Sequence, residues 1–173
     1  MAFYTTSSLI GVDFNTVGTT QLFALGTKAN GSDNSEWVYC RAASVVTAFK
    51  AVRINATYTC GMASVSETIL TTATPGSLGW AQTAFAADEF GWIPIRGTVY
   101  VMTTGSNTLT AGAVPICLGG SAVSTGMASM VATATGTLQG ITIIAHGSGG
   151  QTASATAAQA ILSWPRYAPP SGA

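Results

Sequence analysis

The clearest alternation of apolar and polar positions lies in Gly79–Met102, GWAQTAFAADEFGWIPIRGTVYVM. In its second half, positions 93, 95, 99 and 101 are Ile or Val, and the intervening positions fall on the opposite face of an extended chain. This period of two predicts a half-buried strand. We expect a turn at Asp88–Gly91, so that Gly79–Phe85 folds back as a hairpin partner. Pro94 cannot donate a hydrogen bond to a sheet, which predicts an edge position or a bulge.

Short alternating segments bounded by turn residues recur along the chain. Those that predict strands are Gln21–Gly26, Glu36–Ala42, Arg53–Cys60 and Leu138–His146. Val45–Val52 and the alanine-rich Ala153–Trp164 are compatible with either helix or strand. Ala63–Leu70 is expected to form one short helix, and Leu109–Leu118 a strand with a bulge. Many short strands separated by turns predict an all-β fold, a β-barrel or β-sandwich.

The chain has 173 residues, which is about the length of one domain. We expect a single β domain at 21–164, since no internal repeat or linker interrupts it. Residues 1–20 show no clean period and predict an extended N-terminal arm, although a frayed terminus is the commoner alternative. Pro165–Ala173, PRYAPPSGA, predicts an extended C-terminal tail that cannot be helical.

Charged residues are scarce. They make up 7% of the chain and sum to a net charge of zero, whereas a typical soluble domain has about 25%. A neutral surface of this kind associates readily, so we expect a protein that works in an assembly. No basic run is present to bind phosphates, which argues against nucleic acid. The apolar runs are too short to span a bilayer, and the first residues do not resemble a secretory signal, which predicts synthesis in a cytosol.

The residues that would carry catalysis are few and scattered. His146 is the one histidine, and no G-x-S-x-G turn is present to hold a serine nucleophile. Asp88 and Glu89 are adjacent in the predicted turn, where they cannot face each other across a glycosidase cleft. We therefore predict no enzyme activity and no cofactor.

The chain has three cysteines, Cys40, Cys60 and Cys117. Together with His146 they are formally a zinc ligand set, but they lack the close-spaced pairs that structural zinc sites use. Their odd number and a reducing cytosol predict three buried, unpaired thiols and no metal.

Aromatic residues are the remaining signal, and they suit a sugar-binding platform, a core or contacts between subunits. The set is Trp37, Tyr39, Trp80, Phe85, Phe90, Trp92 and Tyr100. Trp92, Arg96 and Tyr100 share the strand face opposite the Ile/Val positions, and interface centres are enriched in Trp, Tyr and Arg. Interface and plain core are both open for this face. In the arm, Phe3, Tyr4 and Phe14 are the aromatic candidates for contacts with a partner.

Four short motifs are similar to segments of a known family: FALGT at Phe23–Thr27, GSDNSEWVYCRAA at Gly31–Ala43, GWAQTAF…FGWIPIRGTVYV at Gly79–Val101, and LSWPR at Leu162–Arg166. With them the chain resembles the capsid decoration (cement) proteins of tailed bacteriophages and related small head proteins. The resemblance implies a β-barrel-like subunit, usually a homotrimer, that clamps the outer surface of an icosahedral head. The implied partner is the major capsid protein, and the implied location is the virion.

If the resemblance holds, we expect the arm at 1–20 to reach the shell, with Pro165–Ala173 as the second candidate. An alternative from another class is a glycan- or receptor-binding head or tail-fibre protein, whose aromatic residues would surround a groove. A further alternative is another structural subunit of a shell or tail tube.

Overall fold

The computed structural model describes residues 11–63, 77–103, 117–118, 128–129, 137–145 and 156–168. All the regular structure in these residues is β, which confirms the predicted all-β class. The strands are β1 (Lys28–Asn30), β2 (Glu36–Ala42), β3 (Ala51–Ile54), β4 (Thr59–Met62), β5 (Ser77–Trp80), β6 (Phe90–Thr103), β7 (Cys117–Leu118), β8 (Ala128–Ser129), β9 (Thr137–Ala145) and β10 (Thr156–Ala168).

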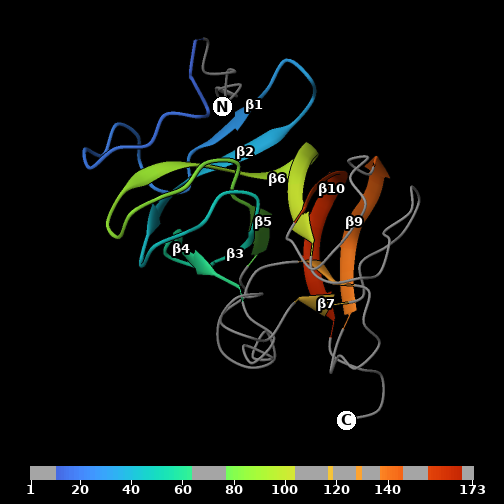
Figure 1. Ribbon diagram of the computed structural model, residues 1–173. Helices are drawn as coiled ribbons and strands as arrows, with labels where there is room; N and C mark the ends of the chain where they lie inside the picture. Colours follow the sequence, from blue (N-terminus) through green and yellow to red (C-terminus); the bar gives the residue numbers. More distant parts are fainter. Residues whose placement is uncertain are drawn as a thin grey trace, which may run out of the picture.

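The strands form one sheet with the order β5-β3-β4-β2-β6-β10-β9. β1 adds to β2, while β7 and β8 form a short pair beside the end of β6. The pairings are antiparallel except for β2 with β4 and β6 with β8. The sheet curls, so that the edge strand β5 also lies against β6 and β10 (Figure 1). This curled sheet belongs to the β-barrel or β-sandwich class.

β6 is the strand that joins the two parts of the sheet (Figure 1). Its first half pairs with β2, from Phe90 to Arg96, and its second half pairs with β10, from Arg96 to Thr103. The register with β2 shifts between Pro94 and Arg96, and β10 does not extend along the strand as far as Pro94. Pro94 stands opposite Trp37, and the extra residue of the bulge is Ile95, so the predicted bulge lies directly beside Pro94.

The predicted Ile/Val face of β6 is buried along its whole length. Ile93 and Ile95 belong to a core cluster formed mainly by β2, β3 and β4. Val99 and Val101 belong to a second cluster, formed with β3, β5, β9 and β10. Both ends of one long strand thus anchor the hydrophobic core, and this part of the sequence prediction is confirmed.

The predicted hairpin between Gly79–Phe85 and β6 is wrong. β5 pairs with β3, where Trp80 is opposite Ala51, and Phe85 forms an isolated bridge with Val46. β6 pairs instead with β2 and β10. The turn before β6 does exist, and the Glu89 carboxylate accepts a hydrogen bond from the Ala86 N–H at 2.6 Å. A period of two shows that a segment is a strand but does not select its partner.

Of four other predicted strands, two are confirmed and two are wrong. Glu36–Ala42 is confirmed as β2, and Leu138–His146 corresponds to β9 with its ends shifted by one residue. Gln21–Gly26 is not a strand, since the first strand begins at Lys28. Arg53–Cys60 is wrong as a single strand, because it contains the end of β3, a tight turn and the start of β4. The turn forms because Asn55 Oδ1 accepts hydrogen bonds from the N–H groups of Thr57 and Thr59, at 3.0 and 2.9 Å.

The remaining predictions concern ambiguous or terminal segments. Ala153–Trp164 lies largely in β10 and is a strand, not a helix. β10 continues to Ala168 and pairs there with β9, so the predicted tail boundary at Pro165 falls inside a strand. Of Val45–Val52, the last two residues open β3. The predicted helix at Ala63–Leu70 and most of Leu109–Leu118 lie outside the described residues.

Candidate functional site

Trp92, predicted as an interface or core residue of β6, lies in an aromatic cluster within the chain. Only 2% of it is exposed. The rings of Phe14, Phe23 and Tyr39 surround it, with centroids 5.5, 5.3 and 5.1 Å from its own. Aromatic pairs at these separations add to the stability that burial alone provides. Trp92 is therefore a core residue of the subunit.

The segment that covers Trp92 is the described part of the predicted arm. Phe14 stacks on Trp37, with ring centroids 4.7 Å apart and an interplanar angle of 3°. Gly18 and Phe90 exchange two backbone hydrogen bonds, of 3.1 and 2.8 Å. Residues 11–20 thus pack on their own sheet, and Phe14 is occupied there. Phe3 and Tyr4 lie outside the described residues.

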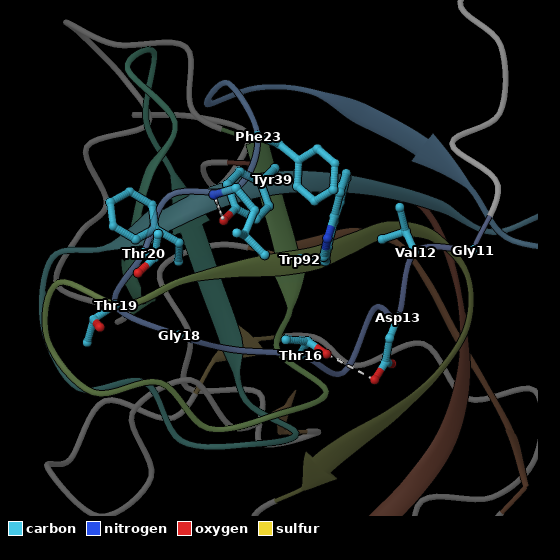
Figure 2. Close-up of a pocket in the computed structure, with 12 residues that line it drawn as sticks. Gly11, Val12, Asp13, Thr16, Gly18, Thr19, Thr20, Phe23, Tyr39 and Trp92 are labelled. Atoms are coloured by element: carbon cyan, nitrogen blue, oxygen red, sulfur yellow. Dashed lines mark hydrogen bonds between the residues drawn. The ribbon is translucent and has the colours of Figure 1, made fainter.

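A cavity of about 720 Å³ lies between this segment and the aromatic cluster. Figure 2 shows the rings of Phe23, Tyr39 and Trp92 turned toward one another, with Thr16 and Asp13 across from them. The Asp13 carboxylate accepts hydrogen bonds from the Asn15 N–H and the Thr16 hydroxyl, at 2.9 and 3.0 Å. The Tyr39 hydroxyl accepts one from the Leu22 N–H at 3.1 Å. These hydrogen bonds hold the loop in place beside the aromatic cluster.

Arg96 and Tyr100 have surroundings different from those of Trp92. The Arg96 guanidinium lies over the ring of Trp164 of β10, 5.0 Å from its centroid, a partner that the sequence analysis did not identify. Tyr100 is 52% exposed. Its backbone is held by the Gln82 side chain, which accepts from the Tyr100 N–H at 2.9 Å and donates to the Tyr100 carbonyl at 3.0 Å. The three predicted residues of one strand face therefore do not form one site.

Tyr100 belongs to an exposed sheet face formed by β6, β10 and β9. The outward side chains of this β6/β10/β9 face are Thr98, Tyr100, Gln159, Ile161, Thr142 and Ile144, and they alternate along each strand with buried residues. None of these six is charged, and Arg96 borders them. Three of the seven exposed large hydrophobic residues in the described part of the chain lie here: Tyr100, Ile144 and Ile161. Exposed apolar side chains that gather on one sheet face are typical of contact surfaces, so this face is a candidate contact surface.

Two ion pairs among the described residues lie away from this face. Lys28 contacts Glu36 at 2.7 Å, and Arg41 contacts Asp88 at 2.5 Å.

In the turn before β2, the Trp37 indole N–H donates to the buried Ser35 hydroxyl at 2.7 Å. That hydroxyl donates to Asp33 at 2.5 Å. The Ser35 hydroxyl thereby lowers the pKa of Asp33, because it stabilises the ionised carboxylate.

Cys40 and Cys60 are buried free thiols on the adjacent strands β2 and β4. The sequence places these two cysteines on separate segments, and the parallel pairing of β2 with β4 brings their side chains together. The hydrogen bond with Cys60 and burial both raise the pKa of Cys40, which keeps its thiol protonated and unreactive. The Cys117 side chain and His146 lie outside the described residues. In the rest, no three His, Cys, Asp or Glu side chains come together as metal ligands.

The described residues include no helix of the length and apolarity that would be needed to cross a membrane. Comparisons of the chain with protein-family models, with curated proteins and with solved structures found no match.

Proposed function

We propose that the chain is a virion structural protein that decorates the outer surface of an icosahedral bacteriophage head as a homotrimer. Its partner is the major capsid protein. The observation that carries this proposal is the uncharged β6/β10/β9 face, where Tyr100, Ile144 and Ile161 stand exposed on a regular sheet. The scarcity of charge along the whole chain and the resemblance to decoration proteins support it.

Such a protein acts by burying surface, with no chemical step. A shell filled with DNA fails where neighbouring capsid subunits separate. A subunit that spans the junction adds its binding free energy to the closed arrangement, as any ligand of a native state does. A contact face without charged side chains loses little free energy to desolvation and is weakly affected by salt.

Three-fold symmetry strengthens this retention. Once one subunit of a trimer is bound, the other two meet the shell at a high effective concentration, so that weak single contacts add up to strong binding. Because residues 11–20 pack on their own sheet, residues 1–10 are the part of the arm that we propose for shell contact. The tail beyond Ala168 is the second candidate. The protein would be made in the host cytoplasm and function on the capsid surface.

The test is to strip the protein from native particles and to add back purified chains. Full-length protein should rebind and restore heat resistance. Tyr100→Ser combined with Ile161→Ser should weaken rebinding at least tenfold, whereas Val45→Ser, at an exposed apolar position outside the face, should not.

A chain beginning at residue 11 separates the role of the arm from that of the sheet face. It should keep its circular-dichroism spectrum, since the packing of Phe14 and Gly18 is retained, but lose shell binding. Equal binding of the shortened chain would remove the arm from the proposal. Failure of the intact chain to bind emptied shells at any concentration would show that the decoration proposal is wrong.

A further inference from the structure

A second cavity, of about 410 Å³, lies between the β3–β4 turn and the end of β10. The strands that bound it can be followed in Figure 1. Its floor is formed by Val38, Ile54 and Ile95, which belong to the hydrophobic core of β2, β3 and β6. Tyr58 and Trp164 stand at its rim. Openings at the mouth of a curled sheet, with an apolar floor and a few polar groups, are common places for ligand sites.

The two rim aromatics are exposed and held in an unusual backbone conformation. Trp164 is 53% exposed and Tyr58 39% exposed. Both have positive φ values, 47° for Trp164 and 58° for Tyr58. Bulky side chains rarely adopt this conformation, and residues that do so cluster at ligand clamps and active sites. Both residues are also partly exposed, so a ligand in the cavity can reach their side chains.

Local structure fixes Trp164 before any ligand arrives. It lies in a bulge of β10, where residues 163–165 stand opposite the single residue Gly140 of β9. A Cβ atom at Gly140 would lie 2.5 Å from the Ser163 carbonyl oxygen, so the bulge needs glycine there. The Arg96 guanidinium, 5.0 Å from the centroid of the Trp164 ring, holds the indole from one side.

Tyr58 is fixed in a comparable way. Its N–H donates to the Asn55 carbonyl at 3.0 Å, and the Asn55 side chain closes the same turn. The phenol ring rests on the backbone of Gly26, where a Cβ atom would come 2.3 Å from the ring carbon Cε2. Both rings are therefore preorganised, which reduces the entropy that a ligand must overcome on binding.

Asn55, Ser77 and Lys28 are the polar residues that line the cavity. The Asn55 Oδ1 accepts hydrogen bonds from Thr57 and Thr59. The Asn55 NH₂ group and the Ser77 hydroxyl are therefore the groups offered to a ligand. The Lys28 ammonium contacts the Glu36 carboxylate at 2.7 Å, which compensates the charge of this lysine. Exposed aromatic rings combined with uncharged hydrogen-bonding groups match a molecule that has apolar C–H faces and hydroxyl edges.

We propose that this cavity binds a neutral saccharide, with the C–H face of a sugar ring against Trp164 and hydroxyl groups directed to Asn55 and Ser77. The volume is at the lower end of the range for small-ligand pockets, about 300–1,000 Å³, which suits about one or two sugar rings. Such a site would let a particle surface adsorb to cell-surface glycans. It does not depend on the capsid proposal, because a fibre protein would use it in the same way.

The experiment is saturation-transfer NMR on the full-length protein with a panel of neutral sugars: glucose, galactose, mannose, N-acetylglucosamine and their disaccharides. We expect at least one sugar to show transfer to its ring protons. Trp164→Gly removes the ring at a position with positive φ, which glycine adopts without strain. The fold should therefore persist, while the affinity for the sugar falls at least about tenfold. Val45→Ala, at an exposed apolar position outside the cavity, should bind sugar as the unmodified protein does.

Tyr58→Asn provides an independent test, since Asn also tolerates positive φ and circular dichroism will report whether either variant unfolds. Loss of transfer in both folded variants supports the site. Absence of transfer from every sugar, or unchanged binding by Trp164→Gly, would overturn it. A synthetic peptide of residues 168–173 is tested in the same way, because proline-containing segments also bind in aromatic grooves. If the peptide binds and no sugar does, the saccharide proposal is wrong. Trp164→Gly should still bind capsid shells, so this proposal and the capsid proposal fail separately.

Discussion

Replacing Trp92 by alanine should destabilise the isolated subunit strongly, even though Trp92 shares its strand face with the exposed Tyr100. The indole is 2% exposed and packs against three other aromatic rings within 5.5 Å. An aromatic side chain buries about 150–250 Å². At about 25 cal/mol per Å² this corresponds to roughly 4–6 kcal/mol of transfer free energy, part of which the alanine retains.

Two structural features modify this magnitude in opposite directions. The ring pairs with Phe14, Phe23 and Tyr39 each contribute about 0.5–1.5 kcal/mol beyond burial, and the variant loses them. The neighbouring cavity of about 720 Å³ lets water reach the space that the indole leaves, which reduces the cost of an empty hole. We therefore expect the free energy of unfolding to fall by about 3–5 kcal/mol. Trp92→Phe should lose less, about 1–2 kcal/mol, because a ring still fills the site.

The assay is urea unfolding followed by far-UV circular dichroism. Trp92→Ala should shift the midpoint to lower urea with an unchanged slope. Tyr100→Ala is the matched control on the same strand, and it should change the free energy of unfolding by about 1 kcal/mol or less, because half of that side chain is already in water. If Trp92→Ala unfolds at the same urea concentration as the unmodified chain, the aromatic cluster does not form in the isolated subunit and the core assignment of Trp92 is wrong.

Three further predictions concern the thiols, the pH dependence and self-association. Titration under denaturing, non-reducing conditions should find three free thiols per chain, and one free thiol would reveal a disulfide. Because the Ser35 hydroxyl lowers the folded-state pKa of Asp33, its contribution to stability is complete above the unfolded pKa of about 3.9 and is lost as the pH falls through the folded value. Asp33→Asn should therefore show a smaller loss of stability below that pH in thermal scans, and parallel curves would count against this role. Analytical ultracentrifugation should show weaker self-association for the Tyr100→Ser, Ile161→Ser protein than for Val45→Ser; equal association would exclude the β6/β10/β9 face as the subunit contact.

The sequence alone determined the class of the fold and one buried face. Alternation in Glu36–Ala42 and at positions 93–101 identified β2 and the Ile/Val face of β6 correctly, because side chains on a strand project in turn to opposite sides. Pro94 likewise marked the bulge beside it, since a residue without an N–H is disfavoured within a regular ladder. These are local properties, and a short stretch of chain contains them in full.

Only the tertiary structure shows which strands pair and whether the side of β6 that carries Trp92 and Tyr100 is buried or exposed. Alternation did not show that β5 pairs with β3, or that Asn55 breaks Arg53–Cys60 into a hairpin. Positions 92 and 100 of β6 have the same periodicity, yet Trp92 is buried because residues 11–30 cover that half of the strand. No described segment covers Tyr100 in this way, and it stays exposed beside β10. Tyr58 lies in a turn and Trp164 in a bulge, more than a hundred residues apart in the chain, and the fold places both on one cavity. The periodicity of a strand shows which side chains point away from the core. Whether another segment covers those side chains depends on parts of the chain that are distant in sequence, and only the tertiary structure shows this.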